Sequence, residues 1–246
     1  MLLGIPRFIG GRMSNSDIVY KSSVIFDKME KNTPLDVPSA IQQRRSIRAF
    51  KPDPIEPTLI RQLINLAVLA PSSSNLQPWR IILVQNPEKK AALTEVCFNE
   101  DIISTAPIIF VFAADVNAWK KDITMVLDQA KQNGAYTDKK VNYCKKAIPQ
   151  FFGRLGDKTR ECAVKDAMIA ATHLVLAAES LGLSTCFVNG WLEYQVKEII
   201  EASNMPDLAI AVLVAVGYAA ESGKNLGRFP LSTNVFIDKF GKGIVE

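Results

Sequence analysis

Histidine is almost absent from this chain of 246 residues, and the cysteines are widely scattered. The one histidine, His173, stands in an apolar helical run, where a packed side chain is a simpler interpretation than a catalytic base. The four cysteines form no CxxC pair and have no histidine nearby, so the ligand spacing of a zinc site is missing (Cys97, Cys144, Cys162 and Cys186). The sequence therefore predicts neither a metal site nor a nucleophile activated by histidine.

Long hydrophobic runs are missing as well. The longest nearly apolar stretch, residues 167–178, is interrupted by two polar residues and falls short of the roughly 20 residues that a bilayer span needs. Residues 1–9 lack a positively charged start and contain Pro6 and Arg7 in what would be the apolar part of a secretory signal. We therefore expect a cytoplasmic protein with no membrane partner.

Charge and composition are those of a globular protein. The 29 Lys and Arg against 25 Asp and Glu leave a formal net charge of +4. No basic stripe with interleaved aromatic residues accompanies this small excess, so we expect no nucleic-acid partner. Residues 1–33 show no sustained helical or strand period and are predicted to form an N-terminal arm, and residues 34–246 are predicted to form a single domain.

Helical and strand patterns follow one another along this domain. Helices are predicted over residues 38–45, 57–69, 87–96, 160–181 and 193–202, strands over residues 80–84, 108–112, 185–188 and 209–216, and a Lys-rich helical excursion with a break near Gly134 over residues 119–152. This order indicates a layered α/β or α+β fold. The helix at 160–181 is apolar nearly all round, so its own domain or a partner subunit must bury it on several faces.

One polar cluster is a set of cations after the first helix, Arg44-Arg45-Ser46-Ile47-Arg48, with Lys51 just beyond and no acid among them. Guanidinium groups and a hydroxyl can hold a phosphate dianion by charge-assisted, bidentate hydrogen bonds. The alternative is an ordinary solvated basic surface.

Two further clusters could contact a flat ring. The loop from Ser72 to Gln77 is dense in hydroxyls and amides that could read the edge of a heterocycle, although such residues also make ordinary turns. Gly190 after Asn189 would let the backbone approach a planar ligand, and Arg228 adds a phosphate-capable cation. The alternative is a strand end and a surface arginine. Neither the dinucleotide-binding glycine motif nor a P-loop is present.

In their order and separations, these motifs resemble those of the FMN-dependent nitroreductases over residues 41–236. The matching segments are Arg44 to Arg48, Ala70 to Trp79, Gly182 to Cys186 leading to Asn189-Gly190, Gly217-Tyr218, and Arg228 to Pro230. The resemblance implies an α+β fold of three layers, in which helices flank a central, mostly antiparallel sheet. It also implies an intertwined homodimer with FMN sites at the subunit interface.

The resemblance assigns cofactor contacts to particular residues. Four would grip the phosphate and ribityl chain of FMN: Arg44, Arg45, Ser46 and Arg228. Four would line the isoalloxazine, some of them from the other subunit: Pro71, Ser72, Ser73 and Asn75. Arg48 would lie by the pyrimidine end, and the backbone N–H near Asn189 and Gly190 would face flavin N5.

The chemistry implied by the resemblance belongs largely to the flavin. NADH or NADPH would pass a hydride to N5 and leave, and a small aromatic electron acceptor, nitroaromatic or quinone, would replace it in a ping-pong scheme. No catalytic side chain is predicted, although Arg48 would stabilise negative charge on the reduced ring. Some family members carry a lysine where this chain has Asn99-Glu100-Asp101, so that role is unfilled or falls to Arg48 alone.

Other functions fit the same motifs. One alternative is a flavin-binding protein of the same fold without reductase turnover, because phosphate and ring contacts establish binding and not catalysis. Another is a fold relative that acts on flavin itself or on a halogenated aromatic.

Overall fold

A four-stranded sheet forms the centre of the protein. The computed structural model describes residues 33–244, so the predicted arm of residues 1–33 lies, apart from Thr33, outside the described residues. The strands are β1 (Trp79–Val84), β2 (Ile108–Asp115), β3 (Ser184–Val188) and β4 (Leu208–Gly217). They lie in the order β1-β2-β4-β3, and each neighbouring pair is antiparallel. The four predicted strands are confirmed.

The two central strands, β2 and β4, are buried on both faces along their whole length. Successive side chains of a strand point to opposite faces. In β2, Phe110 and Phe112 belong to one apolar core, whereas Ile109 and Val111 belong to another. Burial on both faces explains why these strands read in the sequence as continuous apolar runs rather than as alternating patterns.

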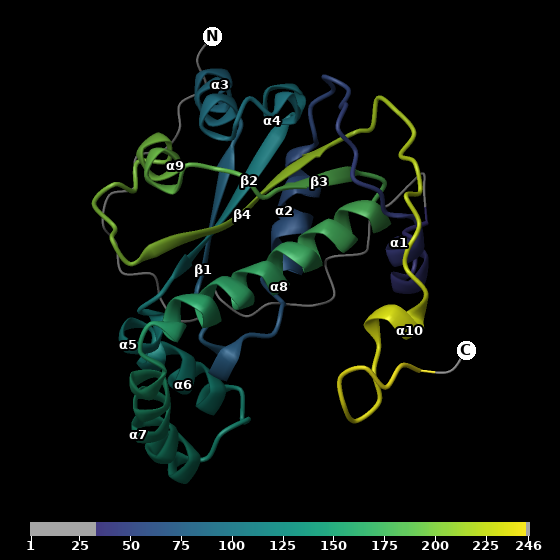
Figure 1. Ribbon diagram of the computed structural model, residues 1–246. Helices are drawn as coiled ribbons and strands as arrows, with labels where there is room; N and C mark the ends of the chain where they lie inside the picture. The colour runs from purple at the N-terminus through teal and green to yellow at the C-terminus, as the bar shows by residue number, and fades with distance from the viewer. Residues whose placement is uncertain (1–32, 245–246) are drawn as a thin grey trace. The chain divides into compact units, whose positions relative to one another are not determined.

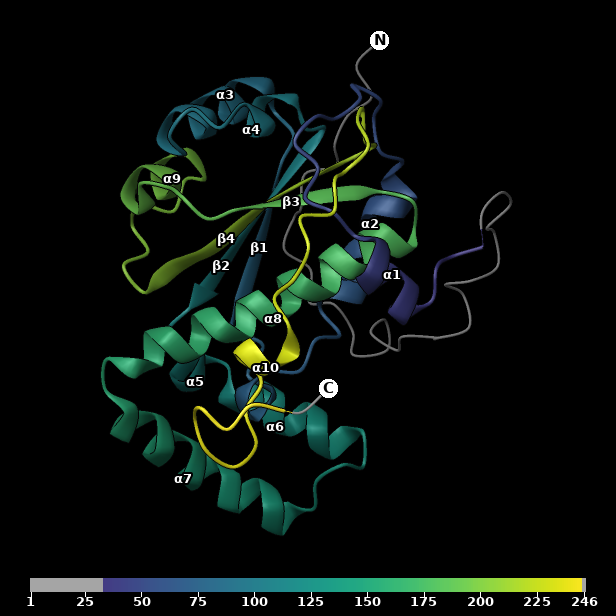
Figure 2. The same cartoon turned by 45° about the vertical axis from the view of Figure 1, so that its right-hand side comes forward.

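Helices cover both faces of this sheet (Figures 1 and 2). The helices α2 (Pro57–Ala67) and α8 (Lys158–Ser180) cover the face of Phe110 and Phe112. The helices α3 (Pro87–Val96), α4 (Asp101–Thr105) and α9 (Glu193–Ile199) lie over the opposite face. The three-layer α+β fold with an antiparallel sheet is therefore confirmed.

The predicted buried helix corresponds to α8. Five of the residues that it buries are alanines, whose small side chains let the helix lie close to the sheet (Ala163, Ala167, Ala170, Ala171 and Ala178). The helix ends just before Gly182, whose φ of 78° suits a glycine. Ile169, on the outer side of α8, remains 38% exposed.

The Lys-rich excursion consists of α5 (Ala118–Lys121), α6 (Ile123–Gln132) and α7 (Asp138–Leu155), with the predicted break between α6 and α7. It has a small core of its own that includes Leu127 and Phe152. Among the described helices, none is both long and apolar enough to cross a bilayer.

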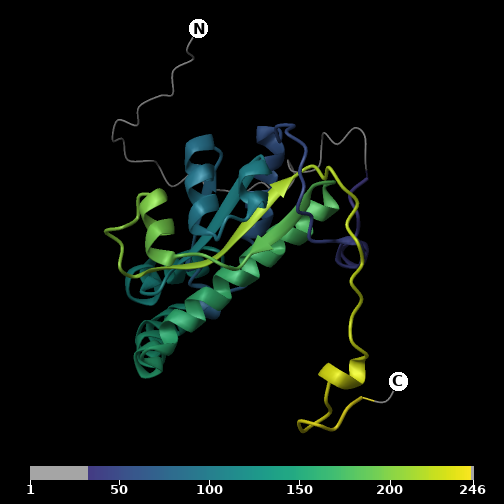
Figure 3. The ribbon, with the colours of Figure 1, turned by 45° about the horizontal axis from the view of Figure 1, so that its top comes forward.

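Three short elements were not predicted: α4, the single 3₁₀ turn η1 (Ser73–Asn75) and α10 (Leu231–Asn234). Each is too short to display a helical period. The first helix, α1 (Val37–Gln43), ends two residues before the predicted end at residue 45, because Arg44 has left the helical conformation. The segment that follows β4 runs away from the sheet toward α10 and the C-terminus (Figure 3).

Candidate functional site

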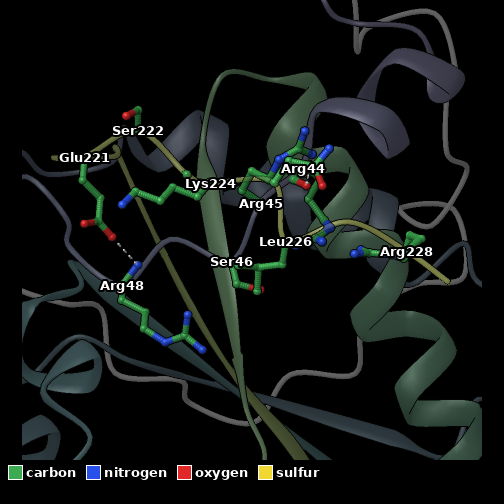
Figure 4. Close-up of a pocket in the computed structure, with 11 residues that line it drawn as sticks. Arg44, Arg45, Ser46, Arg48, Glu221, Ser222, Lys224, Leu226 and Arg228 are labelled. Atoms are coloured by element: carbon green, nitrogen blue, oxygen red, sulfur yellow. Dashed lines mark hydrogen bonds between the residues drawn. The ribbon is translucent and has the colours of Figure 1, made fainter.

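A cation-lined pocket lies where two distant segments meet, residues 44–48 after α1 and residues 221–228 after β4 (Figure 4). Its cavity volume is about 250 Å³. Among the lining residues are five cations and one acid, Glu221. The five cations are Arg44, Arg45, Arg48, Lys224 and Arg228. In the described part of the chain, none of these five side chains forms a salt bridge with a carboxylate. The pocket therefore carries an excess of positive charge.

The backbone of the first segment is fixed to the sheet. The N–H of Ile47 donates to the carbonyl of Thr185 in β3 at 3.1 Å, and the N–H of Lys51 donates to the carbonyl of Tyr218 at 2.8 Å. Ile47 and Phe50 are both buried and anchor the segment in the core. These contacts hold Ser46 beside β3 and aim the neighbouring side chains into the pocket.

Arg45 has a structural role besides lining the pocket. Its Nη1 donates to the carbonyl oxygens of Gln42, Gln43 and Arg44, at 2.7, 3.0 and 2.8 Å. A cation at a helix C-terminus satisfies carbonyls that have no partner within the helix. Arg45 thus fixes the end of α1 at the mouth of the pocket.

The second segment approaches Arg45 very closely at Gly223. A Cβ atom added at Gly223 would lie 2.3 Å from the Cβ and 2.7 Å from the Cγ of Arg45. The glycine is therefore required by close approach and not by its backbone conformation. This contact brings Lys224 and Arg228 to the same pocket as the first segment.

Two hydrogen bonds shape the pocket further. The backbone N–H of Arg48 donates to Oε1 of Glu221 at 3.2 Å, which is the contact drawn in Figure 4. The Nη1 of Arg228 donates to the carbonyl of Gly227 at 2.6 Å. Glu221 and Lys224 were not predicted from the sequence, because nothing local in residues 221–225 marks them as neighbours of residues 44–48.

Burial raises the pKa of two groups that interact with residues 44–48, the Glu179 carboxyl and the Cys186 thiol. It raises the pKa of Glu179, near the end of α8, although the charges of Arg44 and Arg45 act in the opposite direction. Burial likewise raises the pKa of the Cys186 thiol, against the effects of Arg48 and of a hydrogen bond with Ser46.

The residues predicted to contact the flavin ring do not line the cation pocket, apart from Arg48. Asn189 and Gly190 follow β3, a few residues beyond Thr185. A Cβ on Gly190 would lie 3.1 Å from the ring of Phe98, an exposed aromatic residue with a φ of 60°. Aromatic side chains occur in so many settings that the sequence offered no signal for it.

The loop predicted to line the ring joins α2 to β1. Pro71, Ser72, Ser73 and Asn75 are therefore next to β1, which occupies the opposite edge of the sheet from β3. They do not line the cation pocket. Within one chain, the residues predicted to bind phosphate line a single pocket, together with Arg48 (Arg44, Arg45, Ser46 and Arg228). The loop of residues 71–75 does not reach this pocket.

Comparison with known proteins identifies the family. The model of the nitroreductase family matches residues 41–218. The chain belongs to the nitroreductase family. The match covers both the residues before the sheet that line the cation pocket and the whole sheet itself.

Individual nitroreductase-family relatives agree with this assignment. A protein of Thermus thermophilus named NADH dehydrogenase is 35% identical over 206 residues, covering 82% of this chain and 97% of the relative. An FMN reductase (NADPH) of Bacillus subtilis is 28% identical over 193 residues, covering 77% and 68%. A protein of Exiguobacterium sibiricum solved in complex with FMN has a TM-score of 0.74 at 22% identity, covering 84% and 99%, and so shares the fold.

The residues of the pocket fit the phosphate end of FMN. Guanidinium groups match phosphate oxygens bidentately, and the Ser46 hydroxyl can serve another oxygen. The close approach at Gly223 forms a cradle that any side chain would fill. A side chain at this position would have to push Arg45 or the segment of Lys224 and Arg228 aside.

Proposed function

We propose that this protein is an FMN-dependent oxidoreductase that uses NAD(P)H to reduce nitroaromatic or quinone-type acceptors. The observation that carries the proposal is the set of five cations, without carboxylate partners in the described residues, around Ser46 in a chain of the nitroreductase family. Such a cluster destabilises the folded state through self-repulsion unless an anion compensates it. The names of the relatives from Thermus thermophilus and Bacillus subtilis support NAD(P)H as the donor.

Arg44, Arg45, Ser46 and Arg228 would hold the phosphate, and Arg48 would lie toward the pyrimidine end of the ring. The position of Ser46 beside Thr185 supports this arrangement. From Thr185, β3 leads toward Asn189, which lies roughly 13 Å farther along the chain at about 3.3 Å per residue, and Gly190 follows it. The backbone N–H groups there would face flavin N5.

A second copy of the chain would complete the site. The strands β1 and β3 are three strand spacings apart, roughly 14 Å at about 4.8 Å each, so the loop of Ser72 and Ser73 lies away from the cation pocket. The C-terminal segment also exposes large apolar side chains: Leu226 is 90%, Phe229 73% and Phe240 91% exposed. Surfaces of this kind mark interaction sites. A homodimer would cover them and bring the loop of one subunit to the pocket of the other.

When bound, FMN would supply the redox chemistry, taking a hydride from NADH or NADPH and delivering it to a second ligand in a ping-pong scheme. The protein's own contribution is positional and electrostatic. Arg48 would stabilise negative charge on the reduced pyrimidine ring, and no side chain is required to move a proton. We further propose that the protein works in the cytoplasm.

Anaerobic reduction of the FMN-reconstituted protein tests the proposal. Addition of NADPH or NADH should bleach the visible flavin absorbance, and a nitroaromatic or quinone should restore it. A spectrum unchanged by both donors would favour a flavin-binding protein without reductase turnover. Failure to take up FMN would refute the proposal, and recovery of an altered flavin would point to an enzyme that acts on flavin itself.

A further inference from the structure

A buried carboxylate holds the loop between α2 and β1. Asp166, on α8, is 5% exposed. Its two oxygens accept the backbone N–H of Ser73 at 3.1 and 3.0 Å, and Oδ1 also accepts the Ser73 hydroxyl at 3.2 Å. No lysine or arginine of the described residues forms a salt bridge with it. Ser73 therefore supplies the polar contacts that the carboxylate makes.

The loop needs this support because its backbone is strained. Ser74, Asn75 and Gln77 have φ values of 52°, 56° and 48°, in the left-handed region that non-glycine residues rarely adopt. Internal hydrogen bonds close the loop: the Gln77 N–H donates to the Ser72 hydroxyl oxygen at 2.9 Å, and the Asn75 N–H donates to the Ser72 carbonyl at 3.0 Å. The bonds to Asp166 tie it to α8, the long helix that packs on the sheet.

We propose that Asp166 is a positioning residue that fixes Ser73 to receive the isoalloxazine ring. The inference rests on the proposed function. An ionised carboxylate only accepts hydrogen bonds, so the Ser73 hydroxyl is the donor in its hydrogen bond to Asp166 Oδ1. The lone pairs of the Ser73 oxygen then point outward as acceptors. The oxidised isoalloxazine ring has one N–H donor, at N3, and its other polar ring atoms are acceptors. The Ser73 oxygen is therefore oriented to accept the hydrogen bond of N3–H.

The two ends of the cofactor allow this role to be separated from phosphate binding. FMN and riboflavin share the ring and the ribityl chain but differ in the phosphate. A residue that acts at the ring changes the affinity for both ligands by the same factor. A residue that acts on the phosphate changes the affinity for FMN alone.

The test compares Asp166→Asn with two control variants. Asp166→Asn keeps the size of the side chain but removes its charge and replaces one of the two oxygens that accept the Ser73 N–H by an amide N–H₂, which is itself a donor. Asp115→Asn alters another carboxylate that is 5% exposed, one whose oxygens contact Arg80 and Lys121 instead of the loop. Arg44→Ala alters the phosphate pocket. Fluorescence titrations give the Kd of each variant for FMN and for riboflavin, and the bound flavin's visible spectrum is recorded.

We expect Asp166→Asn to weaken both ligands about tenfold and to shift the flavin spectrum. Asp115→Asn should change neither, and Arg44→Ala should weaken FMN only. Equal affinities and an unchanged spectrum for Asp166→Asn would overturn the proposal, as would a loss for FMN alone. If Asp166→Asn does not fold, Asp166→Ala decides by the same criteria. Failure of the wild-type protein to bind either flavin would instead refute the proposed function.

Discussion

Substitution of Gly223 by alanine should damage both the stability and the phosphate site. The added Cβ would lie 2.3 Å from the Arg45 Cβ and 2.9 Å from the Ile47 Cδ1. The Arg45 Cβ is attached directly to the backbone, and the next two residues, Ser46 and Ile47, are paired with Thr185 in β3, so this atom cannot move aside as a flexible side-chain end could. We expect the overpacking to lower the free energy of unfolding by about 1–3 kcal/mol.

The same displacement should weaken FMN binding. If residues 221–228 shift to relieve the contact, one charge-assisted hydrogen bond to the phosphate is lost, which is worth roughly 1.5–3 kcal/mol, or about ten- to a hundredfold in Kd. Riboflavin affinity should stay within about threefold of wild type, because the difference lies at the phosphate.

Urea unfolding of the flavin-free protein and fluorescence titration with FMN measure the two effects. Gly153→Ala is a matched control, because Gly153 lies inside α7 and a Cβ atom added there would meet nothing within 4 Å. That variant should gain about 0.5–1 kcal/mol through helix propensity and bind FMN normally. A Gly223→Ala protein as stable as wild type, with unchanged FMN affinity, would refute the described approach of the two segments.

Three other predictions concern stability and are measured by urea unfolding. Phe110→Ala should lower the free energy of unfolding by about 3–5 kcal/mol, because Phe110, a residue of β2, is fully buried in the core that α8 covers. A loss below about 1 kcal/mol would contradict that packing. Asn86→Ala should cost about 1 kcal/mol, since the Asn86 side chain accepts the Lys89 N–H at the start of α3; no loss would mean that the cap is not formed. Burial raises the pKa of Asp166, so the folded state binds that proton more tightly than the unfolded state does. The contribution of Asp166 to stability should therefore fall as pH rises from the ordinary carboxyl pKa to the raised one, and Asp166→Asn should lack this fall; identical pH profiles would contradict it.

Much of the fold could be predicted because the buried elements have strong local patterns. The strand β4 is apolar throughout, and proline begins both α2 and α3, where its missing N–H costs nothing. The strand order could not be obtained in this way. Burial on both faces removes the alternation that would show which face each residue occupies, and pairing depends on contacts between distant residues.

The site could be predicted in part for a similar reason. Residues 44–48 form one dense local cluster, so their chemistry was visible in the sequence. Lys224 and Glu221 join them only through the approach at Gly223, a contact between residues far apart in the chain. The tie between Ser73 and Asp166 spans 93 residues and likewise has no local signature.

The most direct test of the account is the affinity for FMN, relative to riboflavin, of a protein that carries both Arg44→Ala and Arg228→Ala. Arg228 is chosen over Arg45 because Arg45 also caps α1. Loss of two charge-assisted contacts at roughly 1.5–3 kcal/mol each predicts a fall of about two to four orders of magnitude for FMN. Riboflavin affinity should hardly change. Undiminished FMN binding would show that the cation pocket does not hold the phosphate and would contradict the central claim.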